Sequence, residues 1–88
     1  MITVSDHAKQ ELKGMLIACK ANPEEGFRLM PRADGRFVLA LDSELSGDQV
    51  VEYEGRKVLF VGIEYYKLLN GKILDCQDTK YGEVLIMR

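Results

Sequence analysis

The pairing of two apolar runs across the dipeptide Asp34-Gly35 constrains the fold of this chain more than any other feature. The runs cover residues 26–30 and 36–42, and both have strand-like composition. Asp-Gly between such runs is typical of a tight hairpin, because a type I′ turn needs positive φ at both central residues. The sequence therefore predicts an antiparallel hairpin with a two-residue turn at Asp34-Gly35.

Two more short runs of alternating character follow, at residues 49–53 and 56–61, and Glu54-Gly55 between them predicts a second tight hairpin. The run at 36–42 has apolar side chains on both faces: Phe37, Leu39 and Leu41 on one, Val38 and Ala40 on the other. A strand of this kind is usually covered on both sides. We therefore expect it to be a central strand of its sheet.

A long helix is predicted after a short N-terminal strand at residues 2–4. Ser5 and Asp6 supply an acceptor oxygen and a negative charge suited to a helix N-terminus. Apolar positions then repeat with helical spacing, at Ala8, Leu12, Met15, Leu16 and Cys19. Gly14 is interpreted as tolerated within this helix. We expect the helix to end at Asn22-Pro23, because the residue before proline is disfavoured in the α region.

The C-terminal third predicts a short helix and two strands. The stretch "IEYYKLL" followed by Asn70-Gly71 is typical of a two-turn helix with a left-handed cap, and strands are expected at residues 72–77 and 83–87. The whole order is β, α, four β, short α, two β, with hairpins dominating. This favours a single α+β domain over residues 1–88, mostly β, with two sheets packed against one long and one short helix.

Charge and composition exclude several classes of partner. The 12 basic and 14 acidic residues give a net charge of −2 without a run of like charge, so we expect neither nucleic acid nor membrane as a partner. No basic and apolar leader is recognisable, which predicts a cytoplasmic protein. In that compartment Cys19 and Cys76 are expected as reduced thiols.

Five stretches together resemble the HesB/IscA-like family of A-type iron–sulfur cluster carrier and scaffold proteins. In chain order they are "MITVSDHAKQELKGML", "GFRLM", "LALDSE", "GDQVVEYEGRKVLF" and "LLNGKILDC". Each is weak alone, but they occur in the family's order and spacing over nearly the whole chain. The resemblance implies a HesB-like fold and a relation to iron–sulfur cluster assembly.

The chain departs from this family where the family binds iron or a cluster. Members use one cysteine in a glycine-rich loop, between the strands similar to "GFRLM" and "LALD", and two in a C-terminal Cys-Gly-Cys. Here the Asp34-Gly35 turn replaces the longer loop, and the sequence stops at Arg88 where that tail would follow. Asp34 offers only a hard oxygen, which suits an iron–sulfide core poorly. We therefore expect a degenerate ligand site, with no cofactor and no metal.

Three other side chains carry candidate chemistry. Cys76 alternates with Leu74 and is interpreted as a small apolar residue on a sheet face, the alternative being a metal or redox thiol. Cys19, on the apolar stripe of the helix, is expected to be buried and inert. His7 in the first helical turn is expected to stay neutral beside the positive helix end, with Glu11 as its only partner on that face, and this pair is a weak metal candidate.

Two functional classes remain open. The first is a non-enzymatic HesB/IscA-like domain that works through a protein partner or as a homodimer. The alternative is a thiol-dependent metal, cluster or redox protein that uses Cys76. No catalytic motif is recognisable, so no catalytic residue is predicted. Tyr65 and Tyr66 are expected to place one ring on the sheet and one at the surface beside Lys67, as a helix cap or a partner contact.

Overall fold

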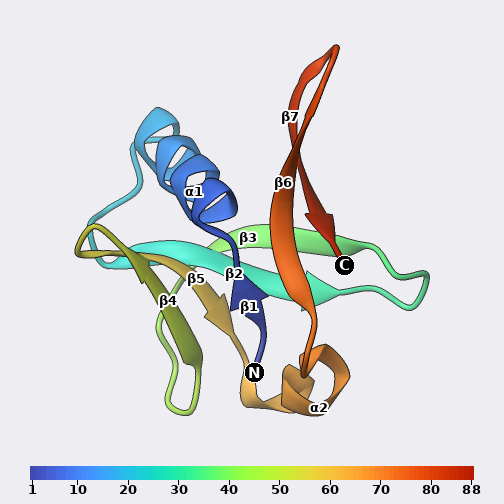
Figure 1. The fold of residues 1–88 in the computed structure, drawn as a ribbon. Helices are drawn as coiled ribbons and strands as arrows, with labels where there is room; N and C mark the ends of the chain where they lie inside the picture. Colours follow the sequence, from blue (N-terminus) through green and yellow to red (C-terminus); the bar gives the residue numbers. More distant parts are fainter.

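The computed structural model describes all 88 residues, and its element order is the one expected from the sequence. Two sheets pack around a shared core, one with the strand order β1-β6-β7 and the other with the order β3-β2-β5-β4 (Figure 1). The predicted fold class is confirmed. The elements are β1 (Thr3–Val4), α1 (Asp6–Ala18), β2 (Glu25–Pro31), β3 (Phe37–Ser43), β4 (Gln49–Tyr53), β5 (Arg56–Val61), the 3₁₀ turn η1 (Ile63–Tyr65), α2 (Tyr66–Leu69), β6 (Ile73–Thr79) and β7 (Gly82–Met87).

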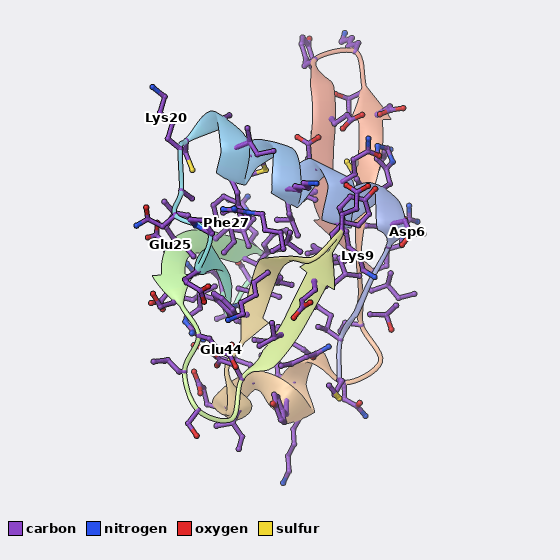
Figure 2. The ribbon with its side chains drawn as sticks, turned by 90° about the vertical axis from the view of Figure 1, so that its left-hand side faces the viewer. Asp6, Lys9, Lys20, Glu25, Phe27 and Glu44 are labelled. Carbon is purple, nitrogen blue, oxygen red and sulfur yellow. The ribbon has the colours of Figure 1, made fainter.

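Helix α1 begins as predicted and ends earlier. The Ser5 hydroxyl caps its N-terminus by accepting a hydrogen bond from the backbone N–H of Ala8 at 3.1 Å. The helix ends at Ala18 because Lys20 adopts left-handed φ of +58°, and the backbone N–H of Ala21 closes the turn on the carbonyl of Leu16. The proline signal predicted the end a turn too late. Figure 2 shows Asp6 and Lys20 at opposite ends of the helix.

The core joins both sheets through the buried stripe of α1. Fourteen buried residues form one cluster, to which α1 contributes Ala8, Leu12 and Leu16. Phe27 of β2 lies beneath the helix (Figure 2). Gly14 faces open space, so its toleration in the helix is confirmed. The helix therefore holds the two sheets together along its inner face.

The run predicted to be central is an edge strand. β2 and β5 occupy the centre of the four-stranded sheet, where β2 pairs with β3 on one side and with β5 on the other. β3 has only one strand neighbour, and its Leu41 is exposed. Both faces of β3 nevertheless carry partly buried side chains. Phe37 and Leu39 pack against the core, and Val38 and Ala40 are half-buried on the opposite face.

Two parallel pairings accompany the three hairpins. β2 and β5 run parallel, and so do β1 and β6, with Thr3 opposite Ile73 and Val4 opposite Leu74. The second pairing joins segments that are about 70 residues apart in the chain. Because α1 follows β1 directly, this pairing also places the first turn of α1 beside the β6–β7 hairpin.

The two predicted tight turns differ in conformation. Glu54 and Gly55 both have positive φ, +52° and +79°, as a two-residue type I′ turn requires. At the other turn only Gly35 is left-handed, with φ of +82°. The backbone N–H of Gly35 donates to the carbonyl of Arg32, and that of Arg32 to the carbonyl of Arg36. The hairpin prediction is confirmed, but the type I′ turn is wrong: a three-residue loop ends in a left-handed glycine.

Replacing Gly35 with valine is expected to lower the free energy of unfolding by about 1–3 kcal/mol. An added Cβ would contact nothing within 4 Å, so the whole effect comes from forcing a β-branched residue into left-handed φ. Urea denaturation measures it. Asp34→Asn is the matched control and is expected to be neutral, since an amide oxygen can also accept the hydrogen bond that Arg36 N–H gives to Asp34. Equal midpoints for both variants would contradict the assigned turn.

A buried arginine on the outer face of the four-stranded sheet forms hydrogen bonds that connect β2 to the end of β3 and to the loop that follows it. Arg28 of β2 is 9% exposed and donates to both carboxylate oxygens of Asp48, at 3.0 and 2.7 Å, as well as to Asp42 and the carbonyl of Ser43. Its guanidinium lies 5.7 Å from the ring centre of the buried Phe60. The Asp48 side chain is only 2% exposed. Hydrogen bonds from Arg28 hold the pKa values of Asp48 and Asp42 below their usual range.

The short helix predicted after β5 is a 3₁₀ turn that continues into a single turn of α2. Gly71 with φ of +81° ends it, as expected from Asn70-Gly71. Tyr65 and Tyr66 are both half-buried against the core, and the Tyr66 hydroxyl donates to the carbonyl of Gly47. The expectation of one surface ring is therefore wrong. None of the helices has the length and apolar run that crossing a membrane would require.

Candidate functional site

Three donor side chains from different elements meet beside the first turn of α1. They are His7 of α1, Cys76 of β6 and Glu83 of β7, and their ligand atoms all lie within 4.8 Å of one another. His7 Nε2 is 3.2 Å from Glu83 Oε1, and Cys76 Sγ is 3.8 Å from Glu83 Oε2. We refer to these three residues as the His-Cys-Glu cluster.

Backbone pairing and one hydroxyl fix the positions of these side chains. The Ser5 hydroxyl, which caps α1, donates to Asp75 of β6 at 2.7 Å, and the same Asp75 oxygen accepts the backbone N–H of Cys76 at 2.8 Å. The β6–β7 hairpin sets Glu83 opposite Asp78, two residues beyond Cys76 on the same face. The start of the helix is thereby tied to the strand that carries the thiol.

Cys76 is 7% exposed and belongs to the hydrophobic core, as the sequence interpretation expected. Its burial raises the pKa of the thiol, and the nearby carboxylates of Glu83, Glu11 and Asp78 raise this pKa further. Without a cation to compensate, the thiol is therefore stable in its protonated form.

His7 differs from expectation, because its pKa is raised rather than lowered. The main cause is its hydrogen bond with Glu83, which outweighs the lowering of the pKa by desolvation. Hydrogen bonding with Glu83 also raises the pKa of Glu11, while the pKa of Glu83 is lowered. The His7/Glu11 pair expected on one helix face is thus joined by a third group that sequence reasoning missed.

Cys19 contradicts the prediction of a buried thiol. It is exposed at the C-terminal cap of α1, where Sγ lies 3.4 Å from the carbonyl of Leu16. The helix ends before its apolar stripe reaches this residue. The 13 residues of α1 span about 20 Å, and Cys76 lies beside His7 at the other end. The two thiols are therefore far apart within one chain.

The hairpin loop at residues 33–35, where the resemblance places a ligating cysteine, carries no thiol. Asp34 is exposed there, and its carboxylate lies 3.6 Å from the Arg36 guanidinium. The side chains of this loop therefore provide no soft donor for an iron–sulfide core.

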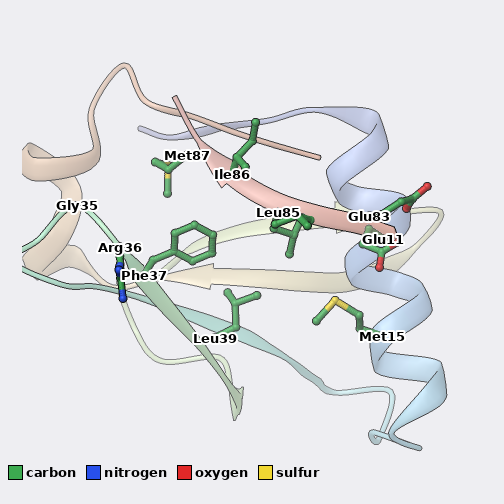
Figure 3. A pocket seen from close by; sticks show the side chains of 11 residues that line it. Glu11, Met15, Gly35, Arg36, Phe37, Leu39, Glu83, Leu85, Ile86 and Met87 are labelled. Atoms are coloured by element: carbon green, nitrogen blue, oxygen red, sulfur yellow. The ribbon is translucent and has the colours of Figure 1, made fainter. Parts of the chain in front are cut away.

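An open apolar groove of about 670 Å³ lies between the two sheets and reaches the His-Cys-Glu cluster. β3 and β7, each an edge strand of its sheet, form its two sides. Figure 3 shows Arg36 at one end, Glu11 and Glu83 at the other, and apolar side chains between them. These apolar residues are half-buried against the core: Met15, Phe37, Leu39, Leu85 and Met87. Sequence reasoning missed the groove, since no local pattern places β3 beside β7.

Comparison with solved structures identifies the fold of this chain. No family model matches this sequence, and no curated protein matches it. The structure is similar to that of Escherichia coli SufA, described as involved in biosynthesis of iron–sulfur clusters, with a TM-score of 0.76 at 21% identity over 99% of this chain and 83% of SufA. It is also similar to IscA with a 2Fe–2S cluster, with a TM-score of 0.68 at 17% identity over 100% of this chain and 84% of IscA.

A third solved structure, a protein from Aquifex aeolicus, has a TM-score of 0.64 at 25% identity, over 99% of this chain and 89% of that one. All three cover nearly the whole of this chain. The chain therefore has the SufA/IscA fold, which is the HesB-like fold expected from the sequence.

Proposed function

We propose that this protein is a non-enzymatic domain related to iron–sulfur cluster assembly that acts by binding a protein partner and does not hold a cluster as the HesB/IscA-like family does. The observation that carries the proposal is the apolar groove between the edges of β3 and β7. In this proposal residues 1–88 form one domain, which works in the cytoplasm and binds neither nucleic acid nor a membrane.

The placement of the thiols supports the absence of cluster ligation. Protein-bound clusters are typically held by four thiolates close together. In this chain the two thiols lie at opposite ends of α1, one exposed and one in the core. The loop at residues 33–35 adds no third thiol.

The groove fits an extended segment of a partner protein. Edge strands present unpaired backbone N–H and C=O groups, which an added strand can satisfy, and side-chain pockets beside them give specificity. Here two such edges face one groove, and its wall between the charged ends is apolar. Arg36 at one end attracts an acidic residue of the segment, and Glu11 at the other attracts a basic one.

The first test is cluster reconstitution. After anaerobic incubation with ferrous iron, sulfide and a reductant, followed by desalting, we expect a colourless protein with no bound sulfide. A family member with all three cysteines serves as the positive control and should turn brown. A visible absorption band with matching amounts of iron and sulfide in this protein would overturn the absence of ligation.

The second test is selection of binding segments from a displayed library of random nine-residue peptides. We expect enriched peptides with alternating apolar residues, one acidic end and one basic end. Val84→Lys places a charge on the 46%-exposed groove residue of β7, and Arg36→Glu reverses the charge at one end. Each is expected to weaken binding at least about 10-fold, which corresponds to 1.4 kcal/mol.

The matched control is Ile17→Lys, which changes an apolar residue that is 62% exposed and does not line the groove. It should leave the affinity unchanged. A second copy of this chain could occupy the groove instead of a partner segment. Light scattering on the protein alone tests this, because it measures whether the chain forms a dimer. A stable dimer that Val84→Lys dissociates, or peptides that bind equally to all variants, would contradict the proposed groove.

A further inference from the structure

We infer that the His-Cys-Glu cluster binds a single divalent transition-metal ion of borderline softness, with Zn²⁺ as the best match. Binding of this single ion does not require the partner that we propose for the groove. None of the three residues lies in the hairpin loop where the resemblance places a cluster-ligating cysteine.

The spacing of the donor atoms matches a tetrahedral ion. Bond lengths of about 2.0–2.3 Å to oxygen, nitrogen and sulfur place neighbouring donors of a tetrahedral zinc ion about 3.3–3.6 Å apart. The His7–Glu83 and Cys76–Glu83 separations are 3.2 and 3.8 Å, and all three atoms lie within 4.8 Å. An ion can therefore be held by small side-chain adjustments without a backbone shift.

The donor set selects the class of metal. Imidazole, thiolate and carboxylate together suit Zn²⁺ and its neighbours, whereas Mg²⁺ and Ca²⁺ require mostly oxygen ligands in larger shells. With a thiolate and a carboxylate as ligands, the charge of the divalent ion is neutralised. Glu11 and Asp78 add negative potential around the thiol.

The surrounding structure positions the ligands and leaves a route for the ion. The Ser5–Asp75–Cys76 hydrogen bonds hold the helix start against β6. The side chains of His7 and Glu83 are each 41% exposed, so an ion can reach the buried thiol from solvent between them. Three protein ligands leave one tetrahedral position for Glu11 or water.

Binding is coupled to loss of the thiol proton. The sulfur of Cys76 bonds to the ion as its S–H bond breaks, and the proton passes to solvent, so no oxidant or reductant is needed.

Anaerobic titration of the full chain with Co²⁺ alone tests the inference, because tetrahedral Co²⁺ reports its ligands in its spectrum. We expect one ion per chain, intense visible d–d bands and a near-ultraviolet thiolate-to-cobalt charge-transfer band, all removed by excess Zn²⁺. Cys76→Ser should abolish the charge-transfer band. His7→Gln and Glu83→Gln should each weaken binding at least about 10-fold, the low end of what supporting residues of metal sites contribute.

Matched controls separate this site from adventitious binding. Cys19→Ser removes the exposed thiol, and Glu52→Gln removes an exposed carboxylate of β4. Both should leave the spectrum and the affinity unchanged. If circular dichroism shows that Cys76→Ser does not fold, the half-exposed His7 and Glu83 variants decide. A charge-transfer band lost with Cys19 rather than Cys76, a spectrum typical of octahedral Co²⁺, or unchanged affinity in the His7 and Glu83 variants would overturn the site.

Discussion

Replacing Arg28 with alanine is expected to lower the free energy of unfolding by about 3–5 kcal/mol, a large part of the about 5–15 kcal/mol that native domains have. The physical reason is the carboxylate left behind. Asp48 is 2% exposed at its side chain, and Arg28 supplies two of its hydrogen bonds. Without the guanidinium, a buried negative charge remains unpaired. Urea denaturation followed by circular dichroism measures the loss.

Removing both charges together is the informative control. In Arg28→Met with Asp48→Leu no unpaired charge stays buried, so this double variant should be more stable than Arg28→Ala alone. Asp42→Asn should cost less than Arg28→Ala, because the Asp42 side chain is 42% exposed and solvent can replace its partner. A double variant less stable than the single one would contradict the unpaired Asp48 charge as the cause of the loss.

The same network predicts acid sensitivity. The pKa values of Asp42 and Asp48 are lower in the folded chain than their ordinary value of 3.8. Groups with a depressed pKa contribute stability that is fully present above the unfolded value and is lost as pH falls through the folded one. Stability should therefore fall below about pH 4, and the fall should be smaller in the Arg28→Met, Asp48→Leu variant.

Replacing Leu12 with alanine is expected to cost about 2–5 kcal/mol. Leu12 is fully buried in the middle of α1, where the helix packs on both sheets, and its truncation leaves a cavity that close-packed neighbours fill only in part. Ile17→Ala on the same helix is the matched control. Ile17 is 62% exposed, so this change should stay within about 0.5 kcal/mol. Similar losses for the two variants would contradict the assigned inner face of the helix.

The turn residues predicted the positions of the chain reversals better than they predicted the types of turn. Glu54-Gly55 forms the two-residue turn expected from its sequence. Asp34-Gly35 has the stronger signal and yet forms part of a three-residue loop, because Arg32 pairs with Arg36 and the Asp34 carboxylate accepts the N–H of Arg36. The register of a hairpin depends on how the flanking strands pair. The two turn residues alone do not determine that pairing.

Periodicity identified the elements but not their neighbours. The apolar faces of residues 37–41 indicated a central strand, but β3 is an edge strand, and its Phe37 and Leu39 both pack against the core and line the groove. The helical spacing placed Cys19 on the apolar stripe of α1. The helix ends just before this residue because Lys20 adopts left-handed φ, and the thiol of Cys19 is therefore exposed. A helical repeat shows which residues share a face only as far as the helix extends.

The candidate site was predictable in part. His7, Glu11 and Cys76 were recognised as possible donors from residue type and local position. Glu83 was missed because its contact with His7 spans 76 residues of sequence and depends on the parallel pairing of β1 with β6. A single sequence carries no local signal for that pairing.

This parallel pairing also sets the order in which the protein can fold during synthesis. The four-stranded sheet uses only residues 25–61, so its strands can assemble before the C-terminal third has been made. β1 must wait for β6, about 70 residues later. Until then α1 and the opening strand have no second sheet to pack against. The His-Cys-Glu cluster is therefore complete only once β7 has been made, and a nascent or truncated protein that stops before β7 lacks Glu83, one of the three donors for a metal ion.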